Sequence, residues 1–417
     1  MLHLIAICTV SIAAVQTFGI LLIGGASETS SMLVIGTALT QAFVSISTYV
    51  IGNATMRACE KKDQILLDDF LLVKIKKYSY ISLLFALITL IIFYGLMQFK
   101  ILKINTNENA ILFGIIIISI TPIIINSMLF SIYRLRGKLV QYELFNLIAN
   151  IISVTGILFF LKQQNIWACG IFISFRSFLP MLTLLPTEIF KLSSKGINFE
   201  QIKSIEVNYQ NEAKKLLFGS VIFKMVTPFD RIIITAISPS SAIYLAVAQQ
   251  IYSVFDFYTQ KAKLNLLLHE KSLSLADHSR LSQNFRGHLT PALYIAILGF
   301  LYYLIVILIW LTVGKYLWIE LIGGDDAMYE PIKIYILLLF GQPICMSAAA
   351  YINGLFYITG KSETPIAIGL LSVMAGYLLK IGALNFGTEY WIPLAISIQY
   401  ITAILIMWYI AQKKDKK

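Results

Sequence analysis

Runs of about 20 apolar residues recur along the whole chain, and no other feature limits the available folds so strongly. An α-helix needs about that length to cross the hydrocarbon core of a bilayer. Mean hydropathy is +0.77, and only 13% of the residues are charged, which is about half the share in a soluble domain. The chain is therefore predicted to be an all-α, polytopic membrane protein.

About twelve transmembrane helices are expected from these runs. The first is too long for the apolar part of a signal peptide and has no lysine or arginine before it, so it should be a retained span. The predicted spans are Leu4–Gly24, Met32–Ile51, Tyr78–Gln98, Ile111–Ile132, Tyr142–Leu161, Ile166–Pro186, Leu216–Ile237, Ser241–Thr259, Pro291–Val313, Ile332–Asn353, Thr364–Leu384 and Trp391–Ala411.

The loop charges predict the orientation of these spans. With the N-terminus inside, 24 lysines and arginines fall in cytoplasmic segments and 4 in outer segments. Positive residues favour the cytoplasmic side, so both termini are expected there. The net charge of +11 then faces the cytoplasm and anionic lipid, and no nucleic-acid partner is needed to account for it.

The two halves of the chain resemble each other. Gly137-Lys138 follows the fourth span and Gly360-Lys361 follows the tenth, an offset of 223 residues. Six spans separate the copies, so both have the same orientation, as in transporters built from parallel repeats. The predicted domains are a six-helix bundle at 1–190, an amphipathic cytoplasmic linker at 191–215 and a second six-helix bundle at 216–417.

Charged residues inside the spans are the candidate functional residues, because burying a charge in a membrane is costly. The predicted substrate-binding residues are Arg176, Lys224, Arg231 and Lys380. Three of them, Arg176, Lys224 and Arg231, would line a hydrated cavity and attract an anion, since guanidinium and ammonium groups bind phosphate well. Lys380 lies near the outer end of its span, where it could also extend to the interface.

A structural role would explain some of the same charges. Asp256 falls at about the depth of Lys224 in the next span, so the two would pair and pin their helices together, while Arg231 reached the outer headgroups. Asp230 and Asp256 could also carry a proton or hold a sodium ion, which would couple transport to an ion gradient. No other cofactor and no metal site are expected.

Several segments resemble the Wzx-type polysaccharide-biosynthesis flippases of the multidrug/oligosaccharidyl-lipid/polysaccharide exporter superfamily. The resemblance lies in Phe229-Asp230-Arg231-Ile-Ile-Ile, in the following Ser241-Ala-Ile-Tyr-Leu-Ala246, and in Leu321-Ile-Gly-Gly-Asp-Asp-Ala-Met-Tyr-Glu-Pro-Ile332. The first outer loop, Ala26–Ser30, departs from the Leu-Gly-Pro-containing turn of that family.

This resemblance implies two pseudo-symmetric six-helix bundles of the MATE type in a bacterial inner membrane. The implied cargo is an oligosaccharide repeat unit of O-antigen or capsule type, linked to undecaprenyl diphosphate and moved to the outer leaflet by alternating access. Implied partners are membrane lipids and the polymerase and chain-length regulator of polysaccharide assembly. Only Asp230-Arg231 among the charged candidates sits on a family-like motif.

Two other functions remain open from the sequence. A drug/cation antiporter of the same superfamily would favour acidic over basic residues in its cavity. A membrane polymerase or acyltransferase would need a large outer loop or histidines within the spans, and neither is found in the sequence. The protein is therefore predicted to be a transporter and not an enzyme.

Overall fold

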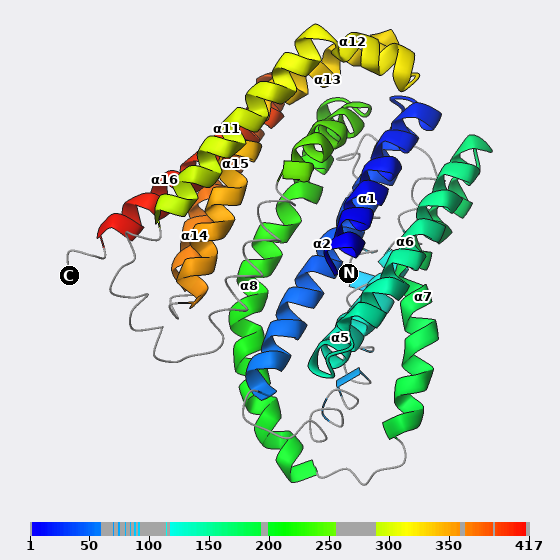
Figure 1. Cartoon of the computed structure of the whole chain (residues 1–417), viewed down its shortest axis with the longest axis vertical. Coiled ribbons are helices and arrows are strands. Elements are labelled where there is room, and N and C mark those ends of the chain that lie inside the picture. Colours follow the sequence, from blue (N-terminus) through cyan, green and yellow to red (C-terminus); the bar gives the residue numbers. More distant parts are fainter. Residues whose placement is uncertain are drawn as a thin grey trace. The chain divides into compact units, whose positions relative to one another are not determined.

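The computed structural model describes residues 2–59, 117–192, 199–255, 289–358, 363–386 and 388–413, together with single positions between 70 and 114. These residues are almost entirely helical, and the chain is a polytopic all-α membrane protein, as predicted. It divides into two compact units, Met1–Pro239 and Ser240–Lys417. Figure 1 shows the helices of both units.

Eight described helices are long and apolar enough to cross a membrane. Of the remaining predicted spans, 78–98 lies outside the described residues apart from single positions, and 111–132 is described from residue 117 onward. The eighth span begins as the short apolar helix Ser241–Phe255. The seventh predicted span is part of a longer helix that is not among the eight. It contains three charged residues, Lys224, Asp230 and Arg231, which make it less apolar than those helices.

The first unit contains six described helices, which pack in two groups. In chain order they are α1 (Leu2–Gly24), α2 (Glu28–Cys59), α5 (Ile120–Leu135), α6 (Leu139–Lys162), α7 (Ile166–Leu192) and α8 (Phe199–Ile237). In one group α2 packs against α5 and α8, and in the other α6 packs against α1 and α7.

The turn between α5 and α6 explains one half of the repeated Gly-Lys pattern. Gly137 adopts φ +69°, a left-handed conformation that glycine reaches without strain. The Lys138 amide donates to the Tyr133 carbonyl at 2.8 Å, and the Gly137 amide donates to the Arg134 carbonyl at 3.1 Å. Together these bonds form a Schellman cap that ends α5. The matching pair, Gly360-Lys361, lies outside the described residues.

Helix α8 runs without a break through the predicted boundary at 215/216. Its first half packs into the first unit, since Tyr209 is 1% exposed and contacts the Phe70 ring edge-to-face at 5.2 Å. Glu206 forms an ion pair with the buried Lys74. The second half of the predicted linker is therefore held by protein contacts here, and the division into two equivalent six-helix lobes stays a prediction.

The second unit is built around a broken helix. The predicted tenth span consists of three helical pieces, and the middle piece is π-helical. The elements of this unit are the helix Ser241–Phe255, α11 (Leu289–Thr312), α12 (Gly314–Tyr316), η2 (Leu317–Leu321), α13 (Asp326–Leu338), η3 (Gln342–Met346), α14 (Ser347–Ile358), α15 (Glu363–Phe386) and α16 (Trp391–Lys413). The helices α11 and α16 pack against the middle piece of the broken span, η3.

Side chains from neighbouring helices satisfy the backbone groups that the break leaves open. Tyr252 and Tyr303 donate from their hydroxyls to the carbonyls of Ile336 and Leu337, at 2.7 and 3.0 Å. Ser397 bridges the break on α16. Its hydroxyl donates to the Leu338 carbonyl at 2.6 Å and accepts from the Gly341 amide at 3.0 Å. Irregular backbone at membrane depth persists only when it is satisfied in this way.

Candidate functional site

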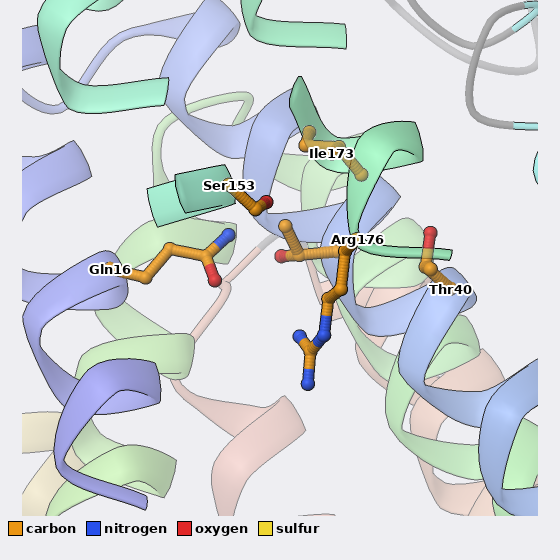
Figure 2. Close-up of a pocket in the computed structure, with 6 residues that line it drawn as sticks. Gln16, Thr40, Ser153, Ile173 and Arg176 are labelled. Atoms are coloured by element: carbon orange, nitrogen blue, oxygen red, sulfur yellow. The ribbon is translucent and has the colours of Figure 1, made fainter. Parts of the chain in front are cut away.

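A small polar cavity lies inside the first unit, between α1, α2, α6 and α7, and Arg176 provides its charge. Figure 2 shows the Arg176 side chain extending from α7 between Gln16 and Thr40. The cavity has an empty volume of about 190 Å³. This volume includes space open to solvent, and the enclosed part is far smaller than the sites that surround a whole small molecule, so the cavity suits a single polar group of a larger ligand. Its lining residues are Gln16, Thr37, Thr40, Ser153, Ile173 and Arg176.

The hydroxyl groups of the cavity wall are oriented by the helix backbones. Thr40 donates to the Gly36 carbonyl at 2.9 Å within α2, and Ser153 on α6 donates across to the Phe172 carbonyl of α7 at 2.7 Å. A hydroxyl that donates to a carbonyl keeps its lone pairs for other partners. Gln16 is 5% exposed, and its carboxamide can both donate and accept.

Arg176 carries the dominant electrostatic property of this cavity. Across the described part of the chain, its guanidinium makes no hydrogen bond or ion pair with another protein group, and no acidic residue lines the cavity. A guanidinium presents five donors in a rigid fork that matches carboxylate and phosphate groups. A partly buried arginine without a counter-ion therefore favours an anionic ligand.

Arg231, on α8, contacts the part of α2 that also lines the Arg176 cavity. Its Nη1 donates to the carbonyl of Val34 at 3.0 Å. The same carbonyl accepts the hydroxyl of Thr37 at 3.0 Å, and Thr37 lines the Arg176 cavity. Two of the predicted cationic residues, from α7 and α8, thus meet the α2 segment Val34–Thr40 within one compact unit.

The remaining predicted site residues have different environments. Lys224 lies on α8, two turns before Arg231, is exposed on its unit and makes no hydrogen bond or ion pair among the described residues. Asp230 is buried, at 1% exposed. Asp256 lies outside the described residues, so its predicted pairing with Lys224 remains a prediction.

Lys380 belongs to the second unit, where it is fully buried and does not extend to the interface. Its Nζ donates to Gln399 Oε1 at 2.8 Å and lies 4.8 Å from the centroid of the Tyr377 ring. These contacts join α15 to α16. Its predicted part in substrate binding stays a prediction.

The sequence analysis looked for charged residues in the spans and therefore missed the uncharged polar residues that line the cavity. Gln16, Thr37, Thr40 and Ser153 are uncharged and common enough in transmembrane helices to attract no notice. One signal was present in the sequence, since Gln16 is the only amide in the first apolar run and Thr37 and Thr40 lie three residues apart on one helix face. Grouping them with Arg176 required the helix packing.

No protein-family model matches this chain, and a comparison with curated protein sequences finds no match. Solved structures do resemble it. A structure of lipid II flippase MurJ in an inward closed conformation aligns with 99% of this chain and 89% of its own length, at 16% identity and a TM-score of 0.74.

Two transporters also share the fold. An inward-facing multidrug resistance MATE family transporter of the MOP superfamily covers 99% of both chains, at 12% identity and a TM-score of 0.60. The eukaryotic MATE transporter AtDTX14 aligns with 99% of this chain and 97% of its own, at 12% identity and a TM-score of 0.58. At such identities the likeness establishes the fold.

Proposed function

We propose that this protein is a flippase that moves a lipid-linked oligosaccharide across the membrane by alternating access. The observation that carries the proposal is the Arg176 cavity, which offers a partly buried cation and neutral hydrogen-bonding groups but no acid among its lining residues. The likeness in fold to a lipid II flippase supports a lipid cargo. A diphosphate is the part of such a cargo that the cavity would bind.

The specific cargo proposed is an oligosaccharide repeat unit of O-antigen or capsule type on undecaprenyl diphosphate. Arg176 would bind the diphosphate through its guanidinium, and Thr40 and Gln16 would add neutral contacts. Arg231 and Lys224 would extend the positive potential along α8. The bacterial inner membrane, both termini in the cytoplasm, and a polymerase and a chain-length regulator as partners belong to the same proposal.

Ion coupling is the remaining part of this proposal. Asp230 and Asp256 are the candidate carriers of a proton or a sodium ion, because a carboxylate at membrane depth is retained mainly for such roles. Replacing each with asparagine should reduce export while leaving binding of the diphosphate intact. Loss of binding in either variant would instead make that carboxylate part of the cargo site.

A drug/cation antiporter is the second candidate, and the MATE transporters of similar fold favour it. The cavity argues against this function, since a cationic drug would be repelled by Arg176. No observation favours an enzyme, and the structures that share the fold are named as a flippase and transporters.

Binding of undecaprenyl diphosphate to the purified full-length chain in lipid nanodiscs tests the proposal. We expect Arg176→Ala to weaken binding by at least about tenfold, equivalent to about 1.4 kcal/mol. Lys162→Ala is the matched control, because Lys162 is an exposed cation at the end of α6. A chain that binds a cationic dye but not the diphosphate, with no effect of Arg176→Ala, would overturn the proposal in favour of the antiporter.

A further inference from the structure

The segment that follows α11 does not continue the span. After Thr312 the chain changes direction, and α12 leads away from the end of α11 at an angle (Figure 1). Two large apolar side chains on this segment are strongly exposed, Tyr316 at 67% and Leu321 at 75%. The segment that carries these side chains is held in place by its own contacts.

Aromatic packing fixes this segment to α11 and α13. Trp318 is fully buried, and its Nε1 donates to the Asp325 carbonyl at 2.9 Å. Beneath it, Trp310 stacks on Tyr329 with 5.8 Å between ring centroids and 9° between planes. The segment is therefore a rigid, folded part of the second unit, and the directions of its exposed side chains are set.

The side next to α13 is polar. Lys315 forms an ion pair with Asp326 at 2.8 Å, and Asp325 caps α13 by accepting from the Ala327 amide at 3.0 Å. Hydrogen bonding to Asp326 raises the pKa of the Lys315 ammonium, so this group stays charged at physiological pH. A folded segment that carries both charged groups and large exposed apolar side chains suits a membrane interface.

The apolar side continues the lipid-facing surface of α11. Leu308 and Leu311, in the last turns of that span, are 63% and 58% exposed. Tyr316 and Leu321 follow these residues along the chain, past the end of the span, and are exposed as well. Tyrosine and tryptophan concentrate at this depth in membrane proteins, because their rings are apolar and their tips are polar.

We propose that the segment Val313–Ile322 is an interfacial anchor, which inserts Tyr316 and Leu321 at the border between headgroups and acyl chains of the leaflet at the α11 C-terminus. Its partner is the lipid surface itself. Anionic lipid is not required, since residues 313–333 carry two lysines against four acids. The anchor would hold the second unit at a constant depth, and it does not depend on what the protein transports.

Site-specific fluorescence on the full-length chain in vesicles tests this anchor. In a variant with Cys8, Cys59, Cys169 and Cys345 replaced by serine, Leu321→Cys is labelled with an environment-sensitive fluorophore. Glu320→Cys is the matched control, because it is the neighbouring exposed residue and its native carboxylate requires water. Tyr316→Cys provides a second apolar position in case Leu321→Cys fails to fold.

In phosphatidylcholine vesicles, we expect labels at 316 and 321 to emit at shorter wavelength than the label at 320. Spin-labelled lipids should quench the labels at 316 and 321 more strongly than the label at 320, and aqueous iodide should quench them less strongly than that label. Adding phosphatidylglycerol should leave this result unchanged. Equal iodide quenching at 316, 320 and 321 would overturn the proposal, as would protection that appears only at high protein-to-lipid ratio, which would indicate a second copy of the chain as the partner.

Discussion

Arg231 on α8 donates from Nη1 to the backbone carbonyl of Val34 on α2, at 3.0 Å. A helix carbonyl normally has one amide partner, and this one also accepts the hydroxyl of Thr37. The Arg231 contact therefore joins two helices that pack along each other and places a guanidinium one turn from the wall of the Arg176 cavity.

Arg231→Ala should loosen the packing of α2 on α8. A hydrogen bond from a charged donor contributes about 1.5–3 kcal/mol, so we expect the free energy of unfolding in detergent to fall by that amount. Lys214→Ala, which removes an exposed cation from the same helix, is the control. Equal denaturation midpoints for the two variants would show that the Val34 contact contributes nothing to stability.

Arg176→Ala should stop export of surface glycan while protein levels stay normal. The change removes a partly buried charge and leaves no described acid without its partner, so folding should not suffer. Surface glycan staining and membrane immunoblots measure the two quantities. Normal export would remove Arg176 from the transport mechanism, whereas loss of the protein from the membrane would indicate a structural role.

Lys224→Ala distinguishes cargo binding from helix pinning. If Lys224 binds the cargo, export should be lost, and a second change, Asp256→Ala, should not restore it. If the two residues pin their helices together, the double variant should recover export, because removing both charges leaves neither one unpaired. Export assays on the two single variants and the double variant decide between these roles.

Ser397→Ala should destabilise the second unit. The serine hydroxyl satisfies both the Leu338 carbonyl and the Gly341 amide at the break between α13 and η3. Leaving a buried polar group unsatisfied costs about 1–3 kcal/mol, so unfolding should become easier by at least that amount. Thr402→Ala on the same helix removes a hydroxyl that bonds only its own helix, at Ile398, and should have a much smaller effect.

Lys380→Met and Gln399→Leu should have different effects, although the two residues share one hydrogen bond at 2.8 Å. Replacing the buried lysine with an apolar residue of similar length removes a desolvated charge, so stability should be unchanged or higher. Replacing Gln399 removes one partner of the buried ammonium and should cost about 1–3 kcal/mol. Loss of export in a stable Lys380→Met variant would instead support the predicted role in substrate binding.

The class of protein follows from the sequence because it depends on local composition. Any run of about 20 apolar residues without charges is more stable as a helix in lipid than in water, wherever it lies in the fold. The same logic identified Arg176, Lys224 and Arg231, since an isolated charge stands out against an apolar background. The Gly137 turn was also visible, because left-handed backbone favours glycine.

The grouping of residues required the tertiary structure. Gln16, Thr37, Ser153 and Arg176 come from four helices, and only the packing of α1, α2, α6 and α7 brings them to one cavity. Similarly, only the structure joined Ser397 to a helix break near residue 341, because a hydroxyl in an apolar span has many backbone groups within reach. Local composition determines which segments enter the membrane, whereas contacts between distant segments depend on how side chains of particular shapes interlock.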